Sequence, residues 1–504
     1  MAWSSLRLEL LVEGGSAVKY QIWAIVWLAG GAALGQSPAM NVIARAAEAV
    51  GGKDQVLAVK TLLIEGSGIN PNIGQNPLPE SPLLNWNVPE FKRSIDLVNG
   101  RMRLEQHRIA GFDFALATDV HQNLGLDGGI AFNVNPDGTA QRAGDAVASE
   151  RRIEMLGNPI AILRAGLDPA TRVEASVRAQ NGEVSIDMVT AAGDKLTLAV
   201  DAKTNLPRHV RWMTSSENLG DVVNTTSFSD YETVDGLKLP KHYVTSINFR
   251  DWVTSDIQVS KNLVDGNVGD LAAPASVKAS PAPLPQPVSV DAQEVGKGIW
   301  WLAGNGNARS ILFEFDDHLT LFETPTSEAR SKAVIDKARS VVPNKPLTEV
   351  IVSHHHFDHT GGLRTAVAEG LTVISHKGNE EIFKEVTSRK ATLKPDLLSQ
   401  SGKKLKFRGV DDTLVLKDKS LEVVIYHVKG NTHSPLLLMA YVPRDKILVQ
   451  GDLIDVGWTQ HPWAENYAKN LEMRKIDFAK DVPVHGKIQT HAEELAAIAA
   501  MKKQ

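Results

Sequence analysis

The pattern of apolar and polar positions changes character about halfway along the 504-residue chain. In the first half, short runs of alternating apolar and polar residues are joined by turn dipeptides, as in half-buried antiparallel strands. The clearest pair, 91–98 and 102–107, flanks Asn99-Gly100 and predicts a hairpin. A helical pattern opens this region at 41–50, and a second one interrupts the strands at 146–163. We therefore predict a mostly antiparallel β domain over residues 36–271.

A proline-rich stretch separates this region from the second half of the chain. Residues 272–287 contain five prolines among alanines and serines, the composition of a semi-rigid linker, which we place at 272–289. Such a linker predicts few contacts between the two parts that it joins. Beyond it the apolar runs become continuous, as in strands covered on both faces, and the run 347–353 is the best example.

The run 347–353 leads directly into a segment of metal-binding residue types, SHHHFDHTGG at 353–362, which a helical pattern follows. Functional side chains of α/β sheets collect where a strand ends and a helix begins. Residues two apart in an extended segment point the same way, so His354 and His356 can bind one metal together. Asp358 and His359 would then face a second metal, and His355 would point away as a supporting or packing residue. A purification tag or a surface histidine run would lack the aspartate, the strand and the glycines.

The ligand types limit the choice of metal. Imidazole nitrogen and carboxylate oxygen suit zinc or another first-row divalent ion. Thiolate ligands are excluded because the chain has no cysteine.

The segment SHHHFDHTGG resembles the signature of the metallo-β-lactamase superfamily, and the resemblance covers about residues 290–504. It implies an αββα sandwich with two metals at one edge of the sheets, so the predicted fold class is α+β with this sandwich after the β domain. It also implies three downstream ligands, which His433, Asp452 and His485 match in order. The implied ligand set is His354, His356, Asp358, His359, His433, Asp452 and His485.

The same resemblance implies a hydrolase in which two Zn²⁺ ions activate a water that attacks a small ester, lactone, thioester or amide. Asp358 would be the catalytic residue, because it would both bind metal and orient the nucleophile. Asp452 would bridge the two metals, where β-lactamases of the family tend to have cysteine or serine. That difference favours ester-like substrates over β-lactams.

Three alternatives stay open beside this interpretation. The first is a class B β-lactamase, and the second is a mononuclear-iron dioxygenase, since iron sites use two histidines and one carboxylate. The third is a non-catalytic carrier of a hydrophobic ligand, because the segment 228–240 resembles periplasmic lipoprotein-carrier half-barrels. The side chains of Trp458, His461 and Trp463 would either line the substrate pocket or cap the core.

The N-terminus and the charge bear on location and partners. Ile22 to Leu34 is an apolar run too short to span a membrane but typical of a signal peptide, and Ala33-Leu34-Gly35 fits a cleavage site. We therefore predict a signal peptide at 1–35 and a periplasmic or secreted protein without a membrane span after cleavage. Because Glu9 and Glu13 do not suit a basic leader, the first residues would be an upstream extension. The alternative is a short apolar helix of the folded domain.

The net charge of −5 and the pI near 6.3 give no electrostatic signature of nucleic-acid binding. The expected partner is therefore a small-molecule substrate. The sequence does not determine the oligomeric state.

Overall fold

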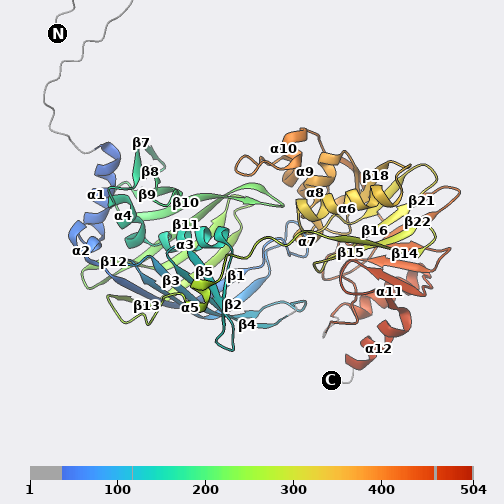
Figure 1. The fold of residues 1–504 in the computed structure, drawn as a ribbon, viewed down its shortest axis with the longest axis horizontal. Coiled ribbons are helices and arrows are strands. Elements are labelled where there is room, and N and C mark those ends of the chain that lie inside the picture. Colours follow the sequence, from blue (N-terminus) through green and yellow to red (C-terminus); the bar gives the residue numbers. More distant parts are fainter. Residues whose placement is uncertain (1–36, 116, 459–461, 502–504) are drawn as a thin grey trace, which may run out of the picture. The chain divides into compact units, whose positions relative to one another are not determined.

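The computed structural model describes residues 37–115, 117–458 and 462–501 (Figure 1). The predicted signal peptide at 1–35 lies outside the described residues. The chain from Pro38 onward forms one compact unit.

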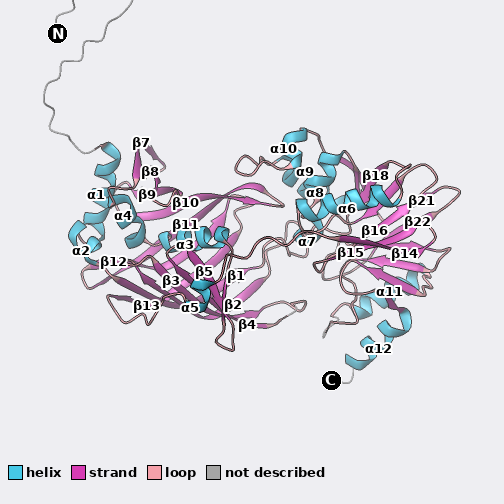
Figure 2. Cartoon of the chain, viewed as in Figure 1, coloured by secondary structure: helices cyan, strands magenta, loops and turns pink. Residues whose placement is uncertain are grey.

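One antiparallel sheet occupies the first half of the chain, as the alternating pattern predicted (Figure 2). Its strand order is β6-β5-β4-β3-β2-β1-β13-β12-β11-β10-β9-β8-β7, so that neighbours in the sheet are neighbours in sequence except at β1 and β13. Gly100 makes the β2–β3 turn with a φ of 63°. The strands are β1 (Thr61–Pro71), β2 (Asn85–Asp96), β3 (Arg101–Ala110), β4 (Asp119–Asp127), β5 (Ile130–Val134), β6 (Ala140–Arg142), β7 (Arg172–Gln180), β8 (Glu183–Val189), β9 (Lys195–Asp201), β10 (Pro207–Ser216), β11 (Gly220–Val234), β12 (Leu237–Ile247) and β13 (Val253–Val264).

Helices α1 (Pro38–Val50), α2 (Lys53–Ala58), α3 (Asp145–Leu156) and α4 (Pro159–Leu167) pack their apolar side chains against this sheet. The helical pattern at 146–163 breaks where Gly157 ends α3. Asn158 then begins α4, because its side chain accepts hydrogen bonds from the backbone N–H groups of Ile160 and Ala161 at 2.9 and 3.3 Å.

The proline-rich stretch is partly packed rather than wholly extended. It contains a short helix, α5 (Ala275–Ala279), whose Val277 is buried against Phe132. Lys278 pairs with Asp127 at 2.9 Å. These contacts hold the start of the predicted linker on the antiparallel sheet.

Two further sheets form the second half of the chain, and the larger has seven strands. Strands β14 to β17 are antiparallel neighbours, whereas β17, β18, β19 and β20 are parallel. Its strands are β14 (Val290–Gly296), β15 (Ile299–Gly304), β16 (Ser310–Glu314), β17 (Leu319–Phe322), β18 (Leu347–Ile351), β19 (Thr372–His376) and β20 (Lys406–Val410).

The smaller sheet has six strands, and only β24 and β25 are parallel in it. Its strands are β21 (Thr413–Lys417), β22 (Glu422–His427), β23 (Leu438–Val442), β24 (Ile447–Gln450), β25 (Lys480–Pro483) and β26 (Gln489–Thr490).

The two sheets pack face to face and helices cover their outer faces, which confirms the predicted αββα sandwich. Side chains such as Ile351 and Phe322 of the larger sheet meet Val449 and Val482 of the smaller sheet in one core. Among the described residues, no helix combines the length and the apolar content that crossing a membrane requires. The helices of this part are α6 (Glu328–Val341), α7 (Phe357–Thr360), α8 (Leu363–Glu369), α9 (Glu380–Ser388), α10 (Leu397–Ser401), α11 (Ala464–Arg474) and α12 (His491–Met501), with a 3-10 turn at Lys377–Asn379.

The prediction of few contacts across the linker is wrong. Phe249 and Trp252 of the antiparallel-sheet part belong to the same apolar core as Val334 and Leu363 of the sandwich. The guanidinium of Arg389 donates to two backbone carbonyls of the antiparallel-sheet part. The boundaries at 36–271, 272–289 and 290–504 stay a prediction, but the two parts share a core.

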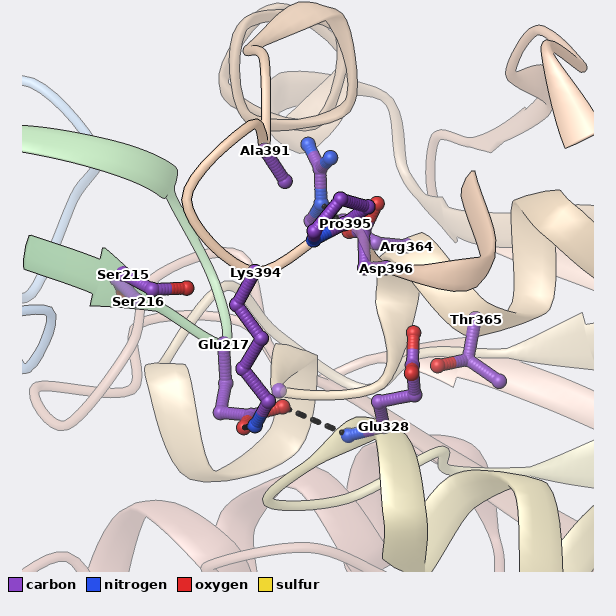
Figure 3. A pocket seen from close by; sticks show the side chains of 11 residues that line it. Ser215, Ser216, Glu217, Glu328, Arg364, Thr365, Ala391, Lys394, Pro395 and Asp396 are labelled. Carbon is purple, nitrogen blue, oxygen red and sulfur yellow. Dashed lines mark hydrogen bonds and ion pairs between the residues drawn. The ribbon is translucent and has the colours of Figure 1, made fainter. Parts of the chain in front are cut away.

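Polar side chains also meet at this junction (Figure 3). They line a cavity of about 30 Å³ between the β10–β11 turn, α6, α8 and the segment 391–396. Within it, Glu217 accepts a hydrogen bond from the backbone N–H of Glu328 at 3.0 Å. This contact holds the β10–β11 turn of the antiparallel-sheet part against the start of α6.

Candidate metal centre

The candidate ligands collect where three strands of the sandwich end. β18 is a buried parallel strand, and the segment between it and α8 contains the histidine motif. Asp452 follows β24 and His485 follows β25, two parallel neighbours in the other sheet. Parallel strands present their carboxyl ends at one edge of a sheet, which is where ligand sites form. The fold therefore brings residues more than a hundred positions apart to one place.

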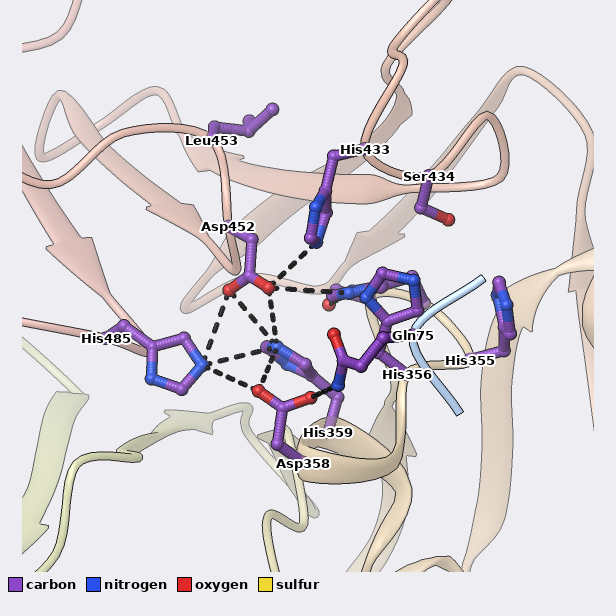
Figure 4. Close-up of polar contacts among 12 residues, drawn as sticks. Gln75, His355, His356, Asp358, His359, His433, Ser434, Asp452, Leu453 and His485 are labelled. Carbon is purple, nitrogen blue, oxygen red and sulfur yellow. Dashed lines mark hydrogen bonds and ion pairs between the residues drawn. The ribbon is translucent and has the colours of Figure 1, made fainter. Parts of the chain in front are cut away.

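All seven predicted ligands lie together, in two groups that share one carboxylate (Figure 4). In each group, one ligand atom of every residue lies within 4.8 Å of the others. Asp452 belongs to both groups. The first group is His354, His356, His433 and Asp452, and the second is Asp358, His359, Asp452 and His485.

The separations between ligand atoms are those of atoms bound to a common ion. In the second group, His485 Nε2 lies 3.3 Å from Asp358 Oδ2, 3.4 Å from Asp452 Oδ1 and 3.3 Å from His359 Nε2. Tetrahedral zinc with bonds of about 2.0–2.1 Å holds its ligand atoms about 3.4 Å apart. In the first group, His354 Nε2 and His433 Nε2 lie 3.6 and 3.0 Å from Asp452 Oδ2.

Two histidine ring nitrogens without hydrogen-bond partners also indicate a metal site. His354 Nδ1 is 2.9 Å from the Ser353 hydroxyl, and its Nε2 has no hydrogen-bond partner although the ring is fully buried. In His356 the two nitrogens have exchanged roles. Its Nε2 donates to the Asn76 carbonyl at 3.0 Å, and its Nδ1 has no hydrogen-bond partner. Buried polar atoms are nearly always hydrogen-bonded or bound to an ion. The residues present therefore fit a metal.

The electrostatics of the two groups differ. Burial lowers the pKa of His354 and of His356 well below the usual value, so both rings are neutral, as metal ligands must be. Burial also opposes charge on His359, but the carboxylates of Asp452, Asp358 and Glu323 raise its pKa well above the usual value. The negative charge of these carboxylates makes the second group favourable for a cation. A metal bound there would replace the proton on His359.

The Glu323 carboxylate contacts the second group through the ring of His359. This side chain follows β17, is fully buried, and stands on a backbone with a φ of 71°. Its Oε1 accepts a hydrogen bond from the Ser353 N–H at 2.9 Å and lies 3.3 Å from His359 Nδ1. A carboxylate at the far nitrogen of a metal-binding histidine fixes the ring orientation, here with Nε2 toward Asp452.

His355 belongs to neither group. The alternation of side chains along the motif predicted that this ring would point away from the ligands. Its Nε2 donates to the Asn76 carbonyl at 2.8 Å. Burial lowers the pKa of His355 to about 3, so the ring is a neutral donor.

Three residues of the antiparallel-sheet part reach the centre, and sequence reasoning missed all of them. Gln75 Nε2 donates to Asp358 Oδ1 at 2.8 Å across 283 positions of sequence. The Asn76 carbonyl accepts from both His355 and His356. The Phe114 ring lies 4.8 Å from that of His433, edge to face. No motif or periodicity marks these positions, and the only local signal is a polar loop after a strand.

The predicted substrate residues have different environments. Trp463 is only 3% exposed and belongs to an apolar core, although its ring lies 4.7 Å from that of His433. Trp458 is half-buried, 6.2 Å from Trp463. His461 lies outside the described residues.

A third group of metal-binding residue types lies on the antiparallel sheet, where His107 Nε2 is 2.8 Å from Asp119 Oδ1 and His121 is nearby. The two rings are stacked 4.2 Å apart at 12°, so their in-plane lone pairs cannot point at one ion. We assign no metal to this group.

Residues 303–457 match the family model described as the metallo-β-lactamase superfamily. A linear primary-alkylsulfatase from Pseudomonas sp. is 34% identical over 76 residues, which is 15% of this chain and 11% of that protein. An (R)-specific secondary-alkylsulfatase from Pseudomonas sp. is 33% identical over 76 residues, 15% of this chain and 12% of that protein. The chain thus spans about a tenth of the length of these curated relatives.

Solved structures include a metallo-β-lactamase from Pontibacter korlensis, with 13% identity, a TM-score of 0.34, and coverage of 43% of this chain and 100% of that one. A metallo-β-lactamase from Hirschia baltica has 16% identity and a TM-score of 0.33, covering 42% of this chain and 97% of that one. Together with the family match, the sandwich and its histidine motif identify residues 303–457 as a domain of the metallo-β-lactamase superfamily.

Proposed function

We propose that the chain is a dinuclear zinc hydrolase that acts on a small ester, lactone, thioester or amide. One observation supports this proposal above all others, namely that two groups of four ligands share the carboxylate of Asp452. Two ions bound there would supply a water of lowered pKa as nucleophile and would polarise the scissile carbonyl.

The exposure of the ligands indicates where substrate would enter. The side chains of Asp358 and His485 are 36% and 13% exposed, whereas those of His354 and His359 are fully buried. Substrate and water would therefore approach on the side of Asp358 and His485.

Asp358 is suited to hold a water in place. Burial favours its neutral form, but His359 and His485 outweigh this effect and lower its pKa well below the usual value. The carboxylate is therefore ionised and accepts hydrogen bonds. Gln75 already donates to Oδ1, which fixes the plane of the carboxylate and directs Oδ2 toward the ligand group.

Hydrolysis of a sulfate ester is a second candidate, because both curated relatives are named alkylsulfatases. A sulfate group carries a negative charge that such sites usually balance with arginine or lysine. Among the described residues, Asp358 and Asp452 form ion pairs only with histidines, and no lysine or arginine forms an ion pair with either carboxylate. We therefore rank a neutral carbonyl substrate first.

Catalytic efficiency across a substrate panel tests the proposal. We expect the zinc-loaded protein to hydrolyse an aryl ester, a thioester or a lactone with kcat/KM at least about tenfold higher than for a penicillin or a carbapenem. A dodecyl sulfate in the same panel tests the second candidate. The Asp358→Ala variant provides the inactive control. Carbapenem hydrolysis without esterase, thioesterase or lactonase activity would show that the proposal is wrong.

A further inference from the structure

We propose that two segments of the antiparallel-sheet part, 72–76 and 112–114, form one wall of the active site. We propose further that this wall selects substrates with a flat, apolar acyl group. The inference rests on the proposed hydrolysis of esters and adds the class of acyl group.

The first segment is fixed against the metal centre by close contacts. Gly74 has a φ of 70°, and a Cβ there would lie 2.2 Å from the ring of Phe357, so the backbone of this segment touches a residue inside the histidine motif. The Asn76 side chain is fully buried and donates to the carbonyls of Leu78 and Ser81, which closes the loop on itself. These contacts place Gln75 at Asp358 (Figure 4).

The Asn76 carbonyl also determines which nitrogen of His356 is free. It accepts a hydrogen bond from Nε2, so Nδ1 carries the lone pair that points at the first ligand group. The antiparallel-sheet part therefore completes the metal centre as well as covering it.

The second segment adds aromatic side chains beside the first ligand group. The Phe114 ring lies 4.8 Å from that of His433 and 6.1 Å from that of Trp463. Phe112 continues the row at 4.8 Å from Phe114. Phe114 is half-buried, so part of this side chain stays exposed next to the candidate ligand His433.

These surroundings indicate the chemistry of the acyl group. Among the described residues of the antiparallel-sheet part, the side chains that contact the ligands through a hydrogen bond or a ring contact are an amide and an aromatic ring, both uncharged. Half-exposed rings at a binding site pack best against flat apolar groups. The alternative is that Phe114 only packs between the two parts of the chain. A comparison of two ester substrates distinguishes the two interpretations.

The test compares two aryl esters with the same leaving group, an acetate and a benzoate, on the zinc-loaded full chain. We expect the wild type to prefer the benzoate. The Phe114→Ala variant should lose about tenfold in kcat/KM on the benzoate through a higher KM, while the acetate values stay within about twofold. Phe114→Trp should restore the preference.

Calorimetric titration of the same proteins with benzoate and acetate ions measures recognition without turnover. Here we expect Phe114→Ala to weaken benzoate binding about tenfold and to leave acetate binding unchanged. Equal losses on both acyl groups, or an unchanged benzoate preference, would overturn the inference. If the wild type hydrolyses neither ester, the proposed function fails, and the titration still decides whether the wall selects flat apolar groups.

Discussion

Replacing Asp452 with asparagine is expected to lower kcat/KM by about 1,000-fold, which corresponds to about 4 kcal/mol of transition-state stabilisation. Among the described residues, the Asp452 carboxylate is the only ligand that belongs to both groups. Burial favours its neutral form, but His359 and His485 outweigh this effect and lower its pKa well below the usual value, so it is an anion. Asparagine removes the charge and one of the two acceptor oxygens that meet His359 and His433.

The matched control for this variant is Asp455→Asn. Asp455 is another buried aspartate, 8% exposed, whose carboxylate accepts from the backbone N–H of Gly457 at 2.8 Å and belongs to neither ligand group. We expect this variant to keep most of the activity. Steady-state kinetics on the best ester, with thermal unfolding to check folding, measures both variants. Near wild-type turnover by Asp452→Asn would exclude a shared carboxylate as the basis of activity.

The second large effect concerns stability and arises at a buried carboxyl pair outside the two ligand groups. Asp481 on β25 and Glu494 on α12 are both fully buried. The Tyr467 hydroxyl donates to Glu494 at 3.0 Å, and the Gln489 amide donates to both carboxyl groups at 2.9 Å. Burial and the neighbouring Asp481 raise the pKa of Glu494 far above its usual value. Near neutral pH the folded pair therefore keeps a proton that two separate carboxyl groups would release.

The sign of the pH dependence follows from this proton. Because the folded pKa is raised, the stabilisation is complete below the unfolded pKa of about 4.3 and is lost as pH rises toward the folded value. Unfolding then releases one proton, so the free energy of unfolding falls by about 1.4 kcal/mol per pH unit, or about 4 kcal/mol between pH 5 and pH 8. Glu494→Gln is a neutral isostere of the protonated acid and lacks this penalty.

Thermal midpoints at pH 5, 6, 7 and 8 measure the effect. We expect the midpoint of Glu494→Gln to rise relative to that of the wild type as the pH increases. Glu493→Gln is the control, because Glu493 is exposed and caps α12 through Thr490, a role that glutamine also performs. Its difference from the wild type should be small and independent of pH. A pH-independent difference for Glu494→Gln would show that the buried pair holds no extra proton.

Four of the seven predicted ligands could be recognised from the sequence because they lie next to one another in the chain. A strand that ends in a His-x-His-x-Asp-His motif specifies four ligands within six residues, and the order of His433, Asp452 and His485 specifies the rest. The motif was expected to be extended, whereas the structure folds Asp358 and His359 into α7. One helical turn still leaves both side chains close to Asp452 and His485, so their role as ligands stays a prediction.

The contacts of the antiparallel-sheet part could not be predicted in this way. Gln75 meets Asp358 across 283 positions, and nothing in the local pattern at either residue encodes that pairing. The proline-rich composition at 272–287 also predicted separation, because composition reports backbone stiffness and not which surfaces meet. The shared core around Phe249 and Trp252 depends on tertiary packing alone.

The metal content of the purified full chain tests the central claim most directly. The protein would be prepared without chelator, and elemental analysis would give the molar ratio of each metal to protein. Two ligand groups sharing Asp452 predict close to two ions per chain, mainly zinc. One iron per chain with no zinc would contradict the account and favour the mononuclear-iron dioxygenase.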